Sequence, residues 1–361
     1  MKKILFSSIL LMGLTAAKAQ TADSLQAPKV TFSGYTEIFY NYDFSEPENH
    51  FRQPFLYTYN RHNEVNLNLG LAKAHYETEN MRANLALMAG TYVQDNMAAE
   101  QGALKHVNEA NVGFKISKDK NVWIDAGILP SHIGWESAVG KDNLTLTRSF
   151  AAENSPYFET GAKISYTSGD GKWFVSGLVL NGWQRIARVE GNQTLGFGHQ
   201  LTYSPNSKFS INSSSFIGND KPQAEKKMRY FHNLYATLKP TEKFTAILGF
   251  DIGAEQKEKG SDAYNIWYTP NVLAKYQMTE KTGIGARVEY FNDKNGVIIS
   301  TGTPGGFQTV GYSLNIDHQI HNNILWRTEA RGLSSKDKIL IQDGDATAGN
   351  FSITTGLSAW F

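Results

Sequence analysis

Charged side chains occupy every second position in two segments of the sequence. Arg287 and Glu289 form the first set, and Arg327, Glu329 and Arg331 form the second. Because residues two apart in a β-strand point to the same face, these charges would lie together on one side of a sheet. Such a row could attract ions and polar solutes, or it could pair across strands and only stiffen the sheet. The sequence leaves both roles open.

The longest connection between strand-like segments spans residues 130–157 and carries charges of both signs. Its candidate functional side chains are Glu136, Asp142, Arg148 and Glu153. If the strands close into a channel, a loop of this length could fold into it, narrow its lumen and create an electric field that selects among hydrophilic solutes. It could equally lie on the surface with ordinary solvated charges.

Residues for catalysis or metal binding form no recognisable pattern. Ser213, Ser214 and Ser215 lie between His199 and His232, but no local motif joins a serine nucleophile to a histidine base. The nine His residues lack the spacing of metal ligands, and Cys is absent. The net charge of +1 lacks the strongly basic footprint of a nucleic-acid partner. We therefore expect no enzyme activity, no metal, no cofactor and no nucleic-acid partner.

The first residues have the composition of a secretory signal peptide. Lys2 and Lys3 precede an apolar segment that ends at Leu14, and Ala17 and Ala19 supply an A-x-A-like cleavage site. The apolar segment is shorter than the ~20 residues that a membrane-spanning helix needs. We predict a signal peptide at residues 1–19, a short periplasmic segment at 20–29 and a single domain at 30–361.

The rest of the chain is dominated by a period of two. Apolar residues alternate with polar or small ones in segments such as 65–71, 310–317 and 351–361, which predicts β-strands. Runs such as 30–42 and 63–76 exceed the typical 5–6 residues of soluble strands and suit the ~9–11 residues of membrane-crossing strands. Their polar face contains Asn, Ser, Thr, Gly, Arg and Glu, as a water-filled lumen requires.

Short and long connections alternate along the chain, which is typical of outer-membrane barrels. The pattern predicts an all-β fold: a transmembrane antiparallel up-and-down β-barrel of about 16 strands, with short periplasmic turns and long extracellular loops. The predicted turns are 77–81, 118–121, 169–172, 205–208, 240–242, 279–281 and 321–323, and the predicted loops are 43–61, 94–104, 130–157, 184–193, 218–227, 255–262, 293–306 and 333–348.

In such a barrel, each strand position faces either lipid or lumen. An Arg or Lys on the lipid face near the midplane costs roughly 2–4 kcal/mol, so strand charges should point inward. The predicted lumen lining is Arg82, Lys163, Arg287, Glu289, Arg327, Glu329 and Arg331. Aromatic residues near strand ends are candidates for the interfacial girdles: Tyr40, Tyr42, Trp173, Trp183, Trp267 and Trp360. The terminal Phe361 resembles the signal that barrels present to their assembly machinery.

Several segments resemble the OmpL-like porin family of Bacteroidetes and related bacteria. The residues that carry the resemblance are Asp125–Pro130 (DAGILP), Gly134–Ser137 (GWES), Thr147–Phe150 (TRSF), Pro156, Tyr157, Gly161 and Val179–Gln184 (VLNGWQ). They lie between residues 120 and 205, and the rest of the chain agrees in layout more than in motif. The resemblance implies a channel fold without naming a substrate.

The sequence thus predicts a porin in the outer membrane of a Gram-negative bacterium. Ions and small hydrophilic solutes would diffuse passively through a water-filled lumen narrowed by residues 130–157. Two alternatives stay open: a substrate-specific channel for a phosphate, sugar or peptide, and a closed structural or adhesive barrel that acts through its extracellular loops. The expected partners are outer-membrane lipid, the barrel assembly machinery and the solutes, with a homotrimer as an option by analogy with general porins.

Overall fold

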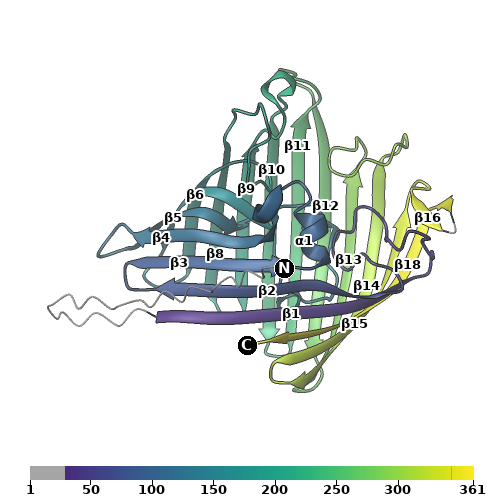
Figure 1. The fold of residues 1–361 in the computed structure, drawn as a ribbon, viewed down its shortest axis with the longest axis horizontal. Helices are drawn as coiled ribbons and strands as arrows, with labels where there is room; N and C mark the ends of the chain where they lie inside the picture. The colour runs from purple at the N-terminus through teal and green to yellow at the C-terminus, as the bar shows by residue number, and fades with distance from the viewer. Residues whose placement is uncertain (1–28, 343) are drawn as a thin grey trace, which may run out of the picture.

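The strands form one closed antiparallel barrel in the computed structural model, which describes residues 29–342 and 344–361 (Figure 1). Each strand pairs with its neighbours along the chain, and β1 pairs with β18 to close the wall. The predicted up-and-down barrel of about 16 strands is confirmed. The wall consists of β1 (Lys29–Asp43), β2 (Val65–Glu77), β3 (Met81–Ala89), β4 (Val107–Lys115), β5 (Asn121–Pro130), β6 (Phe158–Thr167), β7 (Trp173–Leu180), β8 (Gly196–Asn206), β9 (Phe209–Gly218), β10 (Arg229–Thr241), β11 (Phe244–Gln256), β12 (Tyr264–Gln277), β13 (Thr282–Asp293), β14 (Phe307–His321), β15 (Ile324–Ser335) and β18 (Gly349–Trp360).

Short elements occupy some of the long connections. They are α1 (Thr91–Asn96), η1 (Gly102–His106), η2 (Gly140–Asp142), α2 (Phe150–Glu153), η3 (Gln223–Glu225) and the hairpin of β16 (Leu340–Gln342) with β17 (Asp345–Thr347). No helix in the described part of the chain is long and apolar enough to cross a membrane. The predicted signal peptide at 1–19, and all of the predicted 20–29 segment except Lys29, lie outside the described residues.

The connections divide the barrel into two ends. Connections such as 78–80 and 322–323 are short turns, whereas 44–64 and 131–157 are long loops. Ala359 of β18 pairs with Ile324, the first residue of β15 after the turn 322–323, so the C-terminus lies at the short-turn end. The alternation of turns and loops agrees with the sequence prediction.

Exposure alternates along each strand, as a wall between lipid and interior requires. In β13 the side chains of Arg287 and Glu289 are each 1 % exposed, whereas Val288 between them is 57 % exposed. Val272 on β12 and Leu314 on β14 are likewise exposed, and both share the outward face with Val288. The barrel therefore presents an apolar outer surface and a charged inner one.

The interior is more apolar at the long-loop end than the sequence predicted. Phe55 and Phe150 from two loops meet Phe307 edge to face, with ring centroids 4.7 and 5.6 Å apart. Phe291 and Trp267, on inward-facing strand positions, belong to the same buried cluster. Because these loops fold into the barrel, the strand residues beneath them meet protein instead of water and are apolar.

A second apolar cluster surrounds α1. Tyr92 and Val93 of this helix, with Met97 just after it, are buried against Leu69 of β2 and Met88 of β3. The connection between β3 and β4 thus also contributes to the packed interior.

For three of the six residues predicted to form the interfacial girdles, the prediction is wrong, because their side chains do not face lipid. Trp267 is 1 % exposed and shares the inward face of β12 with Thr269. Trp183 packs on Phe216 and on the inward-facing Phe231, with ring centroids 5.2 and 4.8 Å apart. These two tryptophans fill space beneath the inward-folded loops.

Trp360 is the third residue for which the girdle prediction is wrong. It pairs in register with the inward-facing Tyr35, and Lys141 lies 5.3 Å above the Trp360 ring. Tyr40, Tyr42 and Trp173 point outward as predicted from their strand positions. Trp173 is 42 % exposed and stacks on Tyr203 with centroids 4.2 Å apart. Their membership in a lipid-interface girdle stays a prediction.

Candidate functional site in the barrel interior

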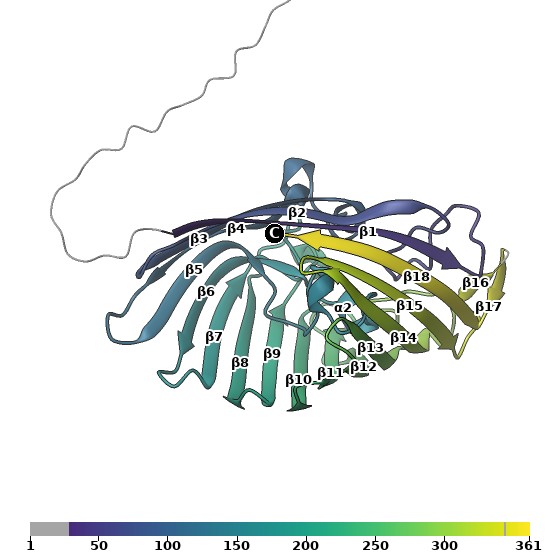
Figure 2. The ribbon, with the colours of Figure 1, turned by 90° about the horizontal axis from the view of Figure 1, so that it is seen from below.

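Residues 131–157, here called the inner loop, run inside the ring of strands. Figure 2 shows α2, which belongs to this loop, enclosed by the wall. Backbone N–H groups of the loop donate to inward-facing side chains: Leu146 to Asn315 at 3.1 Å and Thr147 to Glu329 at 2.6 Å. These contacts fix the middle of the inner loop to β14 and β15.

A buried ladder of charges strengthens this attachment. Arg287 pairs with Glu329 at 2.9 Å and Arg331 pairs with Glu289 at 2.7 Å, and these side chains are at most 2 % exposed. Arg287 also donates to the carbonyl oxygen of Thr147 at 2.6 Å, and Arg331 donates to that of Arg148 at 3.0 Å. Buried charges need such partners, because an unpaired one is costly. The alternating charges seen in the sequence therefore pair across strands and hold the inner loop.

A second charge group anchors the loop nearer to the short-turn end. Arg327 pairs with Asp317 at 2.6 Å, and Lys275 donates to the same carboxylate. Arg327 also donates to the carbonyl oxygens of Gly140 at 2.8 Å and Asn143 at 3.1 Å. The positive charge thus binds backbone of the loop and a carboxylate of the wall.

The beginning of the inner loop is attached to the opposite wall. His132 Nδ1 lies 2.7 Å from Glu159 Oε1, and Nε2 lies 2.8 Å from the carbonyl oxygen of Ser215. Burial disfavours the charged imidazole, but the Glu159 carboxylate and both hydrogen bonds more than offset this and raise the pKa of His132. Since both ring nitrogens face acceptors, the protonated imidazole suits this position best.

Two of the predicted constriction residues join the inner loop to residues 44–64, here called the first loop. Arg148 is fully buried, donates to the Leu146 and Ala138 carbonyl oxygens at 2.9 Å, and lies 5.6 Å above the Tyr59 ring. Glu153 accepts hydrogen bonds from the N–H groups of Tyr57, at 2.9 Å, and Thr58, at 3.2 Å. Burial raises the pKa of Glu153 to about 7, although these hydrogen bonds lower it.

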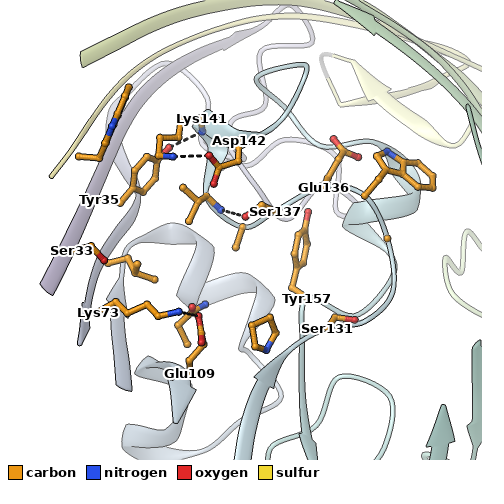
Figure 3. A pocket seen from close by; sticks show the side chains of 18 of the residues that line it. Ser33, Tyr35, Lys73, Glu109, Ser131, Glu136, Ser137, Lys141, Asp142 and Tyr157 are labelled. Carbon is orange, nitrogen blue, oxygen red and sulfur yellow. Dashed lines mark hydrogen bonds and ion pairs between the residues drawn. The ribbon is translucent and has the colours of Figure 1, made fainter. Parts of the chain in front are cut away.

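The other two predicted constriction residues, Glu136 and Asp142, line a cavity of about 610 Å³ between the inner loop and the wall (Figure 3). Glu136 accepts from the N–H of Ser149 at 3.1 Å, and Asp142 pairs with Lys141 at 2.6 Å. Burial raises the pKa of Glu136. A role of these four residues in a constriction stays a prediction.

The far side of this cavity contains an ion pair that the sequence prediction missed. Lys73 of β2 and Glu109 of β4 are 2.8 Å apart and both line the cavity. Each occupies an inward strand position, so the period-two pattern could have indicated their direction but not their pairing. A separate cavity of about 460 Å³, lined by Glu153, Trp183 and other loop residues, lies at the long-loop end and shares no lining residue with the first.

The seven predicted lumen residues all occupy inward strand positions but differ in surroundings. Arg82 pairs with Asp125 at 2.6 Å and lies 4.4 Å above the Trp123 ring, and it remains partly exposed. Lys163 is half-buried on the inward face of β6. The other five, Arg287, Glu289, Arg327, Glu329 and Arg331, are buried beneath the inner loop. Their contribution to a pore lining stays a prediction.

Four of the five residues considered for catalysis lie on the outward face, namely Ser213, Ser215, His199 and His232, whereas Ser214 is buried on the inward face and donates to the carbonyl oxygen of His132. Ser215 Oγ is 2.5 Å from His199 Nδ1, and Ser213 Oγ is 3.0 Å from His232 Nε2. A serine nucleophile also needs free hydrogen-bond donors for an oxyanion. The strands around this group pair with one another in a continuous ladder. Within the described ranges, no group of three or more His, Asp or Glu could hold a metal ion.

The family comparison agrees with this architecture. The sequence model of the family described as "Putative beta-barrel porin-2, OmpL-like" matches residues 29–361. The chain belongs to this OmpL-like porin family. None of the curated proteins compared with the chain matches its sequence.

Solved outer-membrane proteins share the fold at low sequence identity. OmpT of Vibrio cholerae, in its trimer form, is 9 % identical with a TM-score of 0.62 over 93 % of this chain and 100 % of its own. The anion-selective porin of Comamonas acidovorans is 9 % identical with a TM-score of 0.61 and the same coverage. OmpF of Salmonella typhi, in complex with daunomycin, is 11 % identical with a TM-score of 0.59 over 92 % of this chain and 97 % of its own. Membership of the porin family points to a channel, and the solved structures show that the fold is that of outer-membrane barrels.

Proposed function

We propose that the protein is an outer-membrane porin of a Gram-negative bacterium, through which ions and small hydrophilic solutes diffuse passively. The observation that carries this proposal is the inner loop, which lies inside a closed barrel and is fixed there by buried charges. A loop held in this way narrows the lumen and leaves a defined gap beside it. Membership of the OmpL-like porin family supports the same function.

Selectivity in this proposal comes from charges on the two sides of that gap. The inner loop contributes Glu136, Lys141 and Asp142 to the gap, and the wall contributes Lys73 and Glu109. Arg82 and Lys163 occupy inward positions of the wall outside this cavity. Each side carries an ion pair, Lys73–Glu109 on the wall and Lys141–Asp142 on the loop, and the field of these pairs and of Glu136 orients polar solutes and hinders apolar ones.

A homotrimer is part of the proposal for the assembled state. OmpT of Vibrio cholerae, which shares the fold, is described in a trimer form. The outward apolar surface of the barrel would contact lipid or a second copy, and the barrel assembly machinery would insert it. Crosslinking of the protein in native membranes tests the number of subunits.

Single-channel recording in a planar bilayer tests the proposed function. Purified barrel should give stable ohmic steps in KCl, and a salt gradient should give a reversal potential. Asp142→Asn should shift that potential toward anion preference, because it removes a half-exposed negative charge from the gap. Glu190→Gln on an exposed loop is the matched control and should leave the potential unchanged.

One observation favours a second candidate, a closed barrel that acts through its extracellular loops. The first loop, the inner loop and α1 pack two apolar clusters into the long-loop end of the interior. In that case folded and inserted protein would give no current in KCl. If folded and inserted protein carries no current, the open-porin proposal is rejected and the closed barrel is favoured.

A further inference from the structure

The cavity beside the inner loop has an aromatic side. Trp135 and Tyr157 of the loop, Tyr235 of β10, and Tyr35 and Trp360 near the closing seam line it. The six-membered ring of Trp135 inserts against Gly249, where a Cβ atom would come within 2.3 Å of it. Trp135 also meets Tyr235 edge to face at 5.7 Å. Its position is therefore set by the wall, and the remaining ring surface contributes to the cavity.

Every charged side chain that lines the cavity already has a partner. Lys73 is paired with Glu109 at 2.8 Å and Lys141 with Asp142 at 2.6 Å. Glu136 accepts hydrogen bonds from Ser149. A charged solute would have to break one of these pairs. A neutral solute with several hydroxyl groups can instead bridge them, because each pair offers a donor next to an acceptor.

Two further polar groups on cavity-lining side chains lack a protein partner. The indole N–H of Trp135 and the hydroxyl of Tyr157 are buried and make no hydrogen bond within the described protein. Buried polar groups are nearly always hydrogen-bonded, so a solute hydroxyl that reached either group would supply a missing partner. In Figure 3, Tyr157 stands beside Glu136, opposite the Lys73–Glu109 pair.

We propose that this cavity is a binding site for a neutral oligosaccharide on its way through the barrel. This inference rests on the proposed function and adds its substrate class. Aromatic rings pack against the apolar ring faces of a sugar, and the paired charges bind its hydroxyl groups. A volume of about 610 Å³ lies within the ~300–1,000 Å³ of small-molecule sites.

The test combines channel recording with a neutral and a zwitterionic probe of similar length. Maltotriose or trialanine is added at the short-turn side of single channels in KCl. Maltotriose should reduce the current in a saturable way, and trialanine should not. Trp135→Leu should raise the half-blocking concentration about tenfold, a loss of one aromatic contact surface, and Tyr157→Phe should raise it less. Trp173→Leu, on the outward face, is the matched control and should leave it unchanged.

The outcomes separate this inference from the porin proposal. Channels that conduct KCl but ignore maltotriose overturn the inference and keep the porin. Block by trialanine alone, or an equal effect of Trp173→Leu, overturns it as well. If no channel conducts, calorimetric titration of the folded barrel with maltotriose decides: saturable binding that Trp135→Leu weakens supports the site in a closed barrel, and the absence of binding rejects it.

Discussion

At the scale of single residues, two buried titratable side chains hold the inner loop. Glu153 binds backbone N–H groups of the first loop, and His132 bridges Glu159 and the backbone of β9. Burial disfavours the charged form of both side chains, but only His132 has a charged partner in direct contact. Both pKa values are raised, so both residues link the stability of the barrel to pH, in different windows.

Replacement of Glu153 by Gln should remove a pH dependence at mildly acidic pH. The pKa of Glu153 is raised from 4.5 to about 7, so the folded barrel binds a proton that the unfolded chain has lost. The free energy of unfolding therefore falls as the pH rises from 4.5 to about 7, and Glu153 causes no further change above that pH. The measurement is the temperature at which half of the protein shifts from the folded to the unfolded band on a gel, taken at pH 5 and at pH 8. The difference between these two midpoint temperatures should be smaller in Glu153→Gln than in wild type. A Glu190→Gln control with the same small difference would contradict this assignment.

Replacement of His132 by Gln should remove a second pH dependence at higher pH. Because the pKa of His132 is raised from 6.5, its stabilising contribution is complete below 6.5 and is lost as the pH rises through the folded-state value. The same gel midpoint should fall between pH 6.5 and 9 in wild type and change less in His132→Gln. The prediction fails if both proteins lose stability equally over this range.

At the scale of elements, the charge ladder of β13 and β15 determines where the inner loop lies. Its side chains come from strands more than 130 residues away from the loop in sequence: Glu329 accepts from Thr147, and Glu289 accepts from the N–H of Phe150. A buried pair adds little net stability over apolar packing, but loss of one partner costs about 3–5 kcal/mol. The ladder therefore specifies the position of the loop more than it stabilises the barrel.

Replacement of Glu329 by Gln should loosen the inner loop. The change removes one of the two countercharges of Arg287, leaving Glu289 at 3.2 Å, and it removes the carboxylate that accepts from the Thr147 N–H. We expect faster tryptic cleavage after Lys141 and larger, noisier channel steps. Glu255→Gln is a matched control, because its partner Arg229 lies at the long-loop end and, among the described residues, the pair makes no hydrogen bond or ion pair with the inner loop. Equal cleavage in the two variants would show that the ladder does not hold the loop.

At the scale of the whole molecule, the barrel separates an outward apolar surface from an inward polar and charged one. Val288 is 57 % exposed on the outside, directly between the buried Arg287 and Glu289. The same strand thus places opposite chemistry on its two faces. The membrane makes this separation costly to violate, because lipid cannot solvate a charge.

Replacement of Val288 by Lys should destabilise the barrel by about 2–4 kcal/mol, the cost of a charge on the lipid face near the midplane. Ser210→Lys, at a half-buried inward position of β9, should cost less because water and polar groups are available there. Equilibrium unfolding in urea with lipid vesicles measures both variants. An equal decrease in the free energy of unfolding in the two variants would contradict the assignment of the outward and inward faces.

The amino-acid sequence determined the strands, their number and the direction of most side chains. These properties depend on local rules: a period of two assigns alternate residues to opposite faces, and short polar turns end each hairpin. Arg287, Glu289, Arg327, Glu329 and Arg331 were assigned inward by this rule alone, and they point inward in the structure. Motifs between residues 120 and 205 indicated a resemblance to the OmpL-like family, and the family model confirmed it over residues 29–361.

Only the tertiary structure decided what each inward side chain meets. Trp267 and Trp360 were assigned to lipid because aromatic residues near strand ends suit an interface, yet both face the interior. The pairing of Lys73 with Glu109 and the capture of Thr147 by Glu329 join segments that are distant in sequence. A local pattern states which face a residue occupies, but loops that fold into the barrel determine whether that face meets water, a countercharge or an apolar core.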